Sequence, residues 1–161
     1  MDGGTRRRDV TEGDTIPDLT LIGTDGPIRL ADFRGKPFVL YFYPKDDTPG
    51  CTREAQDFSA LADAFAASGV ALLGVSKDSP AKHAKFTAKH GLSVPLASDD
   101  EDGTVLQAFG AWIEKSLYGK TYMGIDRSTF LFDADGRLAR AWRKVKVPGH
   151  AEAVLAAAKA L

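Results

Sequence analysis

The stretch that decides the fold is PFVLYFYPKDDTPGC, residues 37–51. Its first half is short and apolar throughout, which is typical of a central strand that is covered on both faces. The residues that follow, 52–58, are predicted to begin a helix, because apolar side chains recur at helical spacing over residues 58–65. The single cysteine of the chain, Cys51, is therefore expected at the junction where a strand gives way to a helix.

Working outward from this stretch, the first half of the chain alternates strands and helices. Residues 18–30 indicate a β-hairpin with its turn at Asp25 and Gly26. The helix after the junction is expected from about Cys51 to Ala67, and a second buried strand over residues 70–76. Ser79 and a first-turn proline then begin another helix, which ends near residue 91.

The second half of the chain gives weaker signals at first. The stretch before residue 128 is expected to be partly irregular, with residues 93–96 a weak, short strand candidate and residues 104–109 a candidate helical turn. Strands over 128–132 and 138–142 form a second hairpin, and an alanine-rich helix covers 150–161. This order predicts an α/β protein with a thioredoxin-like fold, in which helices flank a central mixed β-sheet and a β-hairpin precedes it.

Length and composition are those of one soluble globular domain. The chain has 161 residues, 43% of them hydrophobic and 27% charged, and a net charge of −1. The charge favours neither a nucleic-acid partner nor an anionic membrane, and no apolar run approaches the roughly 20 residues that span a bilayer. We expect a flexible arm over residues 1–12 and a single domain over 13–161. Arg6, Arg7 and Arg8 are interpreted as part of a solvated arm rather than an anion-binding tag.

Cys51 is the strongest candidate for chemistry in the sequence. A cysteine thiol is mostly protonated at neutral pH, whereas peroxide attack, disulfide exchange and acyl transfer need the thiolate. The first turn of a helix favours negative charge through its unpaired amides and its dipole. Pro44 and Pro49 stiffen the preceding loop, Thr48 offers a hydroxyl to the sulfur or to a substrate, and Arg127 is the best candidate for the cation.

A structural interpretation of Cys51 competes with the catalytic one. The residue stands seven positions before Phe58, on the helix face that meets the sheet, where a small inert cysteine fits equally well. Helix position alone does not separate the two interpretations. The rigid loop, in which Gly50 lets the backbone approach a small ligand, favours a reactive thiol.

The other candidate residues give weaker signals. His83 and His90 are interpreted as surface histidines, because no third residue joins them to make a metal site. His150 is expected in the capping region of the last helix, and the acidic residues 99–102 in a solvated loop. Neither a metal nor another cofactor is predicted. One cysteine permits no internal disulfide and fits a reducing cytoplasm.

The residues around Cys51 resemble a known family. The pattern that joins Pro44, Thr48 and Cys51 with Arg127 downstream is similar to the signature of the peroxiredoxins. The longer strings YFYPKDDTPGCT (residues 41–52, followed at position 54 by Glu54), GIDRSTF (residues 124–130) and VKVPGH (residues 145–150) resemble the bacterioferritin comigratory protein, or peroxiredoxin Q, subfamily. This resemblance runs from roughly residue 13 to the end of the chain.

The resemblance implies a thioredoxin-like fold and a thiol-dependent peroxidase that reduces hydrogen peroxide and organic hydroperoxides. It implies that Cys51 is the peroxidatic cysteine, that Thr48 hydrogen-bonds the sulfur and the peroxide, and that Arg127 holds the thiolate. Pro44 would shield the pocket from water, and Glu54 would orient an arginine of the site. The resemblance also favours a monomeric protein.

The chain departs from that subfamily at one position. Many members carry a second cysteine five residues after the first, whereas this chain has Gln56 there and no other cysteine. An intramolecular disulfide is therefore impossible, and the oxidised cysteine must be reduced by an external thiol: thioredoxin, glutaredoxin or a small thiol. The alternative function is a thioredoxin-fold redox sensor or holdase without turnover. A thiol–disulfide oxidoreductase is disfavoured, because there is no Cys-x-x-Cys pair.

Overall fold

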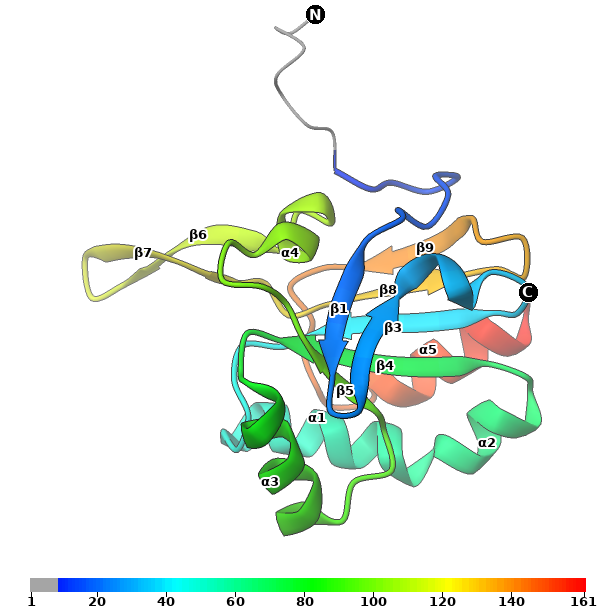
Figure 1. Cartoon of the computed structure of the whole chain (residues 1–161), viewed down its shortest axis with the longest axis horizontal. Coiled ribbons are helices and arrows are strands. Elements are labelled where there is room, and N and C mark those ends of the chain that lie inside the picture. Colours follow the sequence, from blue (N-terminus) through cyan, green and yellow to red (C-terminus); the bar gives the residue numbers. More distant parts are fainter. Residues whose placement is uncertain (1–8) are drawn as a thin grey trace, which may run out of the picture.

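A seven-stranded mixed β-sheet forms the centre of the molecule (Figure 1). The computed structural model describes residues 9–161, and its strands lie in the order β2-β1-β5-β4-β3-β8-β9. β3 (Phe38–Phe42) pairs in parallel with β4 (Ala71–Ser76) and antiparallel with β8 (Ser128–Phe132). All five residues of β3 are buried, which confirms the central strand predicted from its continuous apolar pattern.

The remaining elements flank or extend this centre. The other sheet strands are β1 (Thr20–Gly23), β2 (Gly26–Arg29), β5 (Leu96–Ser98) and β9 (Leu138–Trp142). The helices are the 3₁₀ helix η1 (Leu30–Phe33), α1 (Pro49–Ala60), α2 (Ala62–Ala67), α3 (Pro80–His90), α4 (Thr104–Ala108) and α5 (His150–Lys159). Mixed pairing with helices on both faces confirms the predicted thioredoxin-like α/β architecture.

The two faces of the sheet have separate hydrophobic cores. Side chains alternate across β3, so Leu40 and Phe42 lie in one core and Val39 and Tyr41 in the other. The first core is covered by α4 and the N-terminal segment, and the second by α1, α2, α3 and α5. Cys51 belongs to the second core, so the helix that carries it packs directly against the central strands.

Local signals predicted several helix ends correctly. Ser79 caps α3 by accepting a hydrogen bond from the Lys82 amide, and Gly91 ends it in the left-handed conformation. Two boundaries differ from expectation. The helix expected from Cys51 to Ala67 begins two residues earlier and is divided at Leu61 into α1 and α2. The strand expected over 93–96 lies at Leu96–Ser98 instead, where it completes the pairing with β4.

A second, two-stranded sheet was not predicted. β6 (Trp112–Leu117) and β7 (Lys120–Ile125) form an antiparallel hairpin in the stretch that was expected to be partly irregular. The hairpin projects from the body of the molecule (Figure 1). Its two-residue turn uses Tyr118 and Gly119, both at positive φ, and its end leads directly into the loop that carries Arg127.

The N-terminal boundary also differs from expectation. Arg6, Arg7 and Arg8 lie outside the described residues. Val10, which was placed in the flexible arm over residues 1–12, is buried in the first core and its amide donates to the Ala108 carbonyl. The packed part of the chain therefore begins before residue 13.

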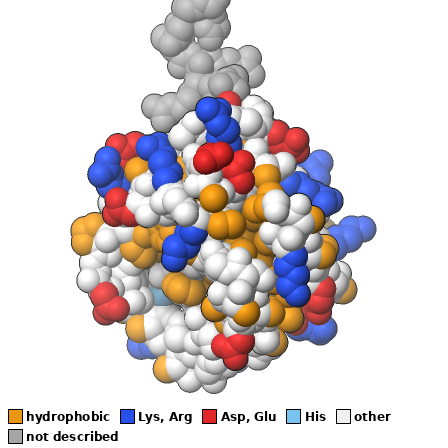
Figure 2. Space-filling view, turned by 90° about the vertical axis from the view of Figure 1, so that its right-hand side faces the viewer, with side chains coloured by type: hydrophobic (Ala, Val, Ile, Leu, Met, Phe, Trp, Pro, Cys, Tyr) orange, Lys and Arg blue, Asp and Glu red, His pale blue; other side chains and the backbone are white. Residues whose placement is uncertain are grey.

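The described residues contain no helix that is long and apolar enough to cross a membrane. The face shown in Figure 2 carries basic, acidic and apolar side chains close together. This mixture matches the near-zero net charge of the sequence and gives that face no single-sign patch of the kind that binds nucleic acid.

Candidate active site

Cys51 lies in the first turn of α1. Thr48 is the N-cap residue, Pro49 is the first residue of the helix, and the first helical amide with an acceptor is that of Thr52, which donates to the Thr48 carbonyl at 2.8 Å. The amides before it point out of the helix end, where they favour negative charge. Cys51 is only 2% exposed, so its sulfur lies beneath the surface between α1 and the sheet.

Arg127 brings a positive charge to the sulfur. It stands between β7 and β8, and its Nη2 donates to Cys51 Sγ at 3.3 Å. The same guanidinium passes close to Gly50, where a Cβ atom would lie 3.2 Å from Nη2. Glycine at position 50 thus leaves the room that the guanidinium needs beside the helix start. Helix amides and one cation converge on the sulfur, an arrangement that stabilises a thiolate.

Glu54 holds the other side of the Arg127 guanidinium. It follows Cys51 by almost one helical turn, is 1% exposed, and its Oε1 accepts from Arg127 Nη1 at 2.7 Å. Burial raises the pKa of Glu54 to about 7, although the charge of Arg127 and this hydrogen bond lower it. Glu54 Oε2 and the Tyr41 hydroxyl are buried without a hydrogen-bond partner in the described structure.

The structure gives Thr48 a different hydrogen bond from the one expected. Its hydroxyl hydrogen is donated to the Lys45 carbonyl at 2.9 Å rather than to the sulfur. The Thr48 oxygen therefore faces its surroundings as an acceptor. Pro44 is half-buried at the start of the same loop, directly after the core tyrosine Tyr43. The sequence-predicted site residues thus come from one loop, the first turns of α1 and the connection between β7 and β8.

His83 is not the surface residue that the sequence suggested. Its side chain is fully buried, and its two ring nitrogens lie 2.7 Å from Asp46 Oδ2 and 2.9 Å from the Ala97 carbonyl. The apolar periodicity of α3 does not reveal this burial, because the partners of His83 come from a loop and from β5. His90 is more accessible and contacts Asp47 at 2.9 Å.

His150 contributes more than a helix cap. Its side chain is buried, and Nε2 lies 2.8 Å from Thr129 Oγ1 on β8. Burial, together with the charge of Arg127, lowers the pKa of His150 to about 4. The polar Thr129, in a strand that is buried along its whole length, is the sequence signal that could have indicated a buried polar partner.

Asp99 is likewise buried rather than solvated. Its carboxylate accepts hydrogen bonds from the amides of Asp100, Val105 and Leu106, and so caps α4. Within residues 9–161, no group of three or more histidine, cysteine, aspartate or glutamate residues is arranged to hold a metal ion.

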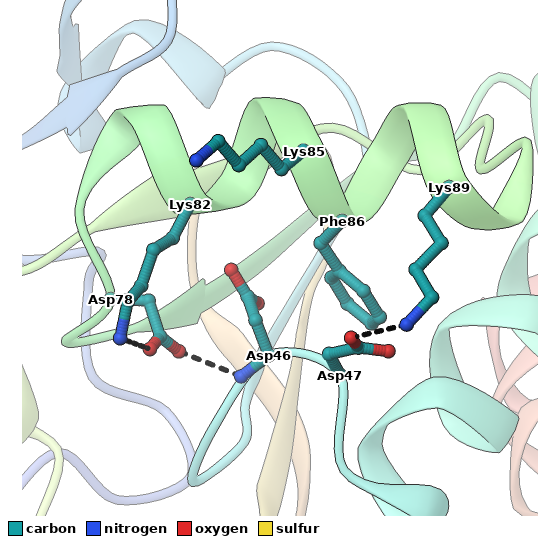
Figure 3. A pocket seen from close by; sticks show the side chains of 7 residues that line it. All are labelled: Asp46, Asp47, Asp78, Lys82, Lys85, Phe86 and Lys89. Atoms are coloured by element: carbon teal, nitrogen blue, oxygen red, sulfur yellow. Dashed lines mark hydrogen bonds and ion pairs between the residues drawn. The ribbon is translucent and has the colours of Figure 1, made fainter.

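A surface pocket of about 270 Å³ adjoins the loop that precedes Cys51 (Figure 3). Carboxylates from two loops face lysines on α3 across it, and Phe86 provides its apolar surface. The lining residues are Asp46, Asp47, Asp78, Lys82, Lys85, Phe86 and Lys89. Acidic and basic side chains are equal in number here, so the pocket itself has no net charge at neutral pH.

Comparison with known proteins identifies relatives along most of the chain. A family model described as the AhpC/TSA family matches residues 12–141. The chain is 52% identical over 139 residues to Peroxiredoxin Bcp of Bacillus subtilis, covering 86% of this chain and 88% of that protein. It is 54% identical over 122 residues to Peroxiredoxin Bcp of Xanthomonas campestris, covering 76% of each.

Solved structures give the same result. The bacterioferritin comigratory protein of Xanthomonas campestris, studied for its alkyl peroxide reduction activity, superposes with a TM-score of 0.84 at 48% identity, covering 91% of this chain and 98% of that one. A cysteine-to-serine mutant of PrxQ from Xylella fastidiosa superposes with a TM-score of 0.88 at 41% identity, covering 95% and 98%.

Proposed function

We propose how peroxide is reduced at Cys51, starting from the premise that this chain belongs to the AhpC/TSA family. The match to that family and to the peroxiredoxin Bcp relatives confirms the resemblance found in the sequence. The protein is a thiol-dependent peroxidase of the peroxiredoxin type, which acts on a peroxide and is reduced by a thiol. The observation that carries the proposal is the 3.3 Å contact between Arg127 Nη2 and Cys51 Sγ.

In the peroxide step, the Cys51 thiolate attacks one oxygen of the peroxide. A sulfur–oxygen bond forms as the oxygen–oxygen bond breaks, so the sulfur becomes a sulfenic acid and the second oxygen leaves as water or an alcohol after taking up a proton. Negative charge moves from the sulfur to the leaving oxygen. The Arg127 guanidinium and the amides at the start of α1 are already directed at this region and stabilise that charge.

The remaining residues orient these groups. The Thr48 oxygen accepts a hydrogen bond from the peroxide hydroxyl. This role is supported by the structure around Thr48, whose own hydroxyl hydrogen is donated to the Lys45 carbonyl. Glu54 fixes the Arg127 guanidinium through the 2.7 Å bond, and Pro44 shields the site from water. These assignments make Cys51 the nucleophile and Arg127 the cation that stabilises the transferred charge, while Thr48, Glu54 and Pro44 position or shield them.

Reduction of the sulfenic acid requires a second molecule, because the chain has no other cysteine. An external thiol attacks the sulfenic sulfur and releases water, which leaves a mixed disulfide. A second thiol then restores the Cys51 thiol and carries away the disulfide. Because Cys51 is buried, the first turn of α1 has to unwind to admit a protein thiol such as thioredoxin or glutaredoxin.

For the substrate we propose hydrogen peroxide and organic hydroperoxides. The organic class is supported by the alkyl peroxide reduction activity studied in the Xanthomonas relative. We also propose that the protein acts as a monomer in the cytoplasm, where a lone thiol stays reduced. The non-enzymatic alternative, a redox sensor or holdase without turnover, is not favoured by the relatives.

The proposal is tested by steady-state peroxide consumption with hydrogen peroxide and with cumene hydroperoxide. Each is combined in turn with thioredoxin and its reductase, with glutaredoxin and glutathione, and with a small dithiol. Cys51→Ser should abolish turnover in every combination, whereas Thr52→Ser, one position further along α1, should retain it. Full activity of Cys51→Ser would remove Cys51 from the reaction.

A further inference from the structure

A buried histidine lies behind the catalytic loop, and none of the steps above uses it. His83 comes from α3 and is fully buried, yet it touches no residue assigned to the peroxide reaction. Its partners are the side chain of Asp46 in the loop, the backbone carbonyl of Ala97 in β5 and, at 3.3 Å, the Tyr43 hydroxyl at the end of β3. It therefore joins three separate elements: the loop between Pro44 and Thr48, α3 and the interior strand β5.

The chemistry of these partners indicates which atoms of His83 and Asp46 form hydrogen bonds. A carbonyl only accepts, so the Nε2 atom that faces Ala97 carries a hydrogen. The Nδ1 atom lies 2.7 Å from Asp46 Oδ2, so the two side chains are joined by a hydrogen bond. Tyr43 donates to Asp46 Oδ1 at 2.5 Å, and burial raises the pKa of Tyr43 so that it stays a donor. Both oxygens of the Asp46 carboxyl group are thus held from within the protein.

The backbone beside Asp46 is held as firmly as its side chain. The peptide group between Lys45 and Asp46 donates its N–H to Asp78 Oδ2 at 2.7 Å, as drawn in Figure 3. The carbonyl of that same peptide group accepts the Thr48 hydroxyl hydrogen at 2.9 Å. The orientation of one peptide plane therefore decides where the Thr48 oxygen points.

From this chain of contacts we infer that His83 is a positioning residue for the peroxide step. It holds Asp46, Asp46 fixes the Lys45–Asp46 peptide plane, and that plane aims the Thr48 oxygen toward the peroxide. His83 acts on the loop without contacting substrate or sulfur. The inference rests on the proposed function, because it assigns a purpose to this geometry only if Cys51 reacts with peroxide.

Two substitutions of His83 separate positioning from simple packing. Asparagine places its amide nitrogen near the position of Nδ1 and can still donate to Asp46, whereas glutamine places it near Nε2 and can donate only to Ala97. Each variant loses one hydrogen bond, and asparagine, which is one methylene shorter than glutamine, leaves the larger cavity. A purely structural role therefore predicts that His83→Asn is at least as harmful as His83→Gln, while positioning predicts that only His83→Gln frees the loop.

The measurement is the second-order rate constant for oxidation of Cys51 by hydrogen peroxide, followed by tryptophan fluorescence in a single turnover. We expect His83→Gln to lower it about 10- to 100-fold, the cost of misplacing a reacting group by a fraction of an ångström to one ångström. His83→Asn should keep most of the wild-type rate constant. Alkylation of Cys51 by iodoacetamide should change less than about threefold in both, since the Arg127 contact is untouched.

A second pair of variants tests the inference independently, should the His83 variants fail to fold. Asp46→Ala should slow the peroxide step as His83→Gln does, whereas Asp47→Asn, at the next position and paired with exposed Lys89 and His90, should leave it within about twofold. Equal rates for His83→Gln and His83→Asn, or a normal rate for Asp46→Ala, would overturn the inference. A wild-type protein that is slow with peroxide would instead overturn the proposed function.

Discussion

Arg127 is the residue whose geometry ties the site together, because one guanidinium serves both the sulfur and Glu54. Its Nη2 and Nη1 atoms donate to Cys51 Sγ and Glu54 Oε1 at 3.3 and 2.7 Å. A lysine has a single point charge and no fork with which to hold both acceptors.

Arg127→Lys is therefore expected to lower the rate constant of the peroxide step about 10²- to 10³-fold, as loss of a directed donor to developing charge does in other enzymes. Stopped-flow fluorescence with hydrogen peroxide measures it. Arg53→Lys is the matched control, since Arg53 lies on the exposed side of α1 and pairs with Asp57. A rate within twofold of wild type for Arg127→Lys would show that the fork is unnecessary.

The raised pKa of Glu54 makes the free energy of unfolding depend on pH. Its pKa is raised from 4.5 to about 7 by burial, so the folded protein binds a proton that the unfolded chain has lost between these values. Stability from this group is present below pH 4.5 and is lost as pH rises through about 7, by an amount on the order of 3 kcal/mol.

Glutamine at position 54 does not titrate. Between pH 4.5 and 7.5, the free energy of unfolding of Glu54→Gln should therefore increase relative to that of the wild type. Urea unfolding at several pH values measures this difference. A constant difference across the range would contradict the raised pKa of Glu54.

Single residues were predictable where the sequence places them beside the reactive thiol, and not where distant elements bury them. Cys51 and Arg127 were found because a strand end and a helix start are visible in the pattern, and the contact between them is present in the structure. The catalytic roles of these residues stay predictions. His83 was wrongly expected on the surface, because its burial depends on Asp46 and Ala97, which no periodicity in α3 reveals.

At the scale of elements, one buried hydrogen bond attaches α5 to the sheet. His150 begins α5, and its Nε2 lies 2.8 Å from Thr129 Oγ1 on β8. The pKa of His150 is lowered to about 4 by burial and by Arg127, so the unfolded chain binds a proton at mildly acidic pH that the folded protein does not. The stability contributed by the neutral imidazole is present above pH 6.5 and is lost as pH falls through about 4.

His150→Phe should fill the space but leave the Thr129 hydroxyl without its partner, at a cost of about 1–3 kcal/mol at pH 7. This deficit should shrink as pH falls from 6.5 to 4, because only the wild type has the contribution of a neutral His150 to lose. Urea unfolding followed by fluorescence of Trp142, which packs against His150, measures both values. A deficit that grows toward low pH would contradict this account of α5.

The elements that the sequence predicted well have one face or both faces buried. β3 is apolar throughout, and α3 has a serine cap and a glycine stop, so both were visible. β6 and β7 are largely exposed on both faces, with Tyr118 95% exposed at their turn, so the alternation that normally marks a half-buried strand is absent. This exposure explains why the sequence does not predict the hairpin.

At the scale of the whole molecule, the single cysteine limits what the oxidised protein can become. Without a second thiol in the chain, the sulfenic acid persists until a reductant or another peroxide reaches it. Excess hydrogen peroxide without reductant should therefore drive Cys51 to the sulfinic acid.

Mass spectrometry of the intact protein should show a gain of two oxygen atoms at Cys51. A stoichiometric amount of peroxide, quenched with a small thiol, should instead give one mixed disulfide per chain. Persistence of the sulfenic acid alone under a large excess of peroxide would contradict the expected vulnerability.

The order of strands and helices was enough to predict the α/β class and the mixed sheet, because short apolar strands alternate with amphipathic helices along the chain. The position of β1 beside β5 was not predictable in this way, since that pairing joins residues far apart in sequence. Val10 was placed in a flexible arm for the same reason. Its partner, Ala108, lies almost a hundred residues away.

The central claim is that the folded site, rather than the cysteine alone, makes Cys51 react with peroxide. The most direct test mixes the protein with an equimolar amount of hydrogen peroxide at neutral pH and follows loss of the thiol, in buffer and in denaturing urea. The account predicts loss within seconds for the folded protein and over hours for the unfolded chain. Loss over hours in both would contradict it.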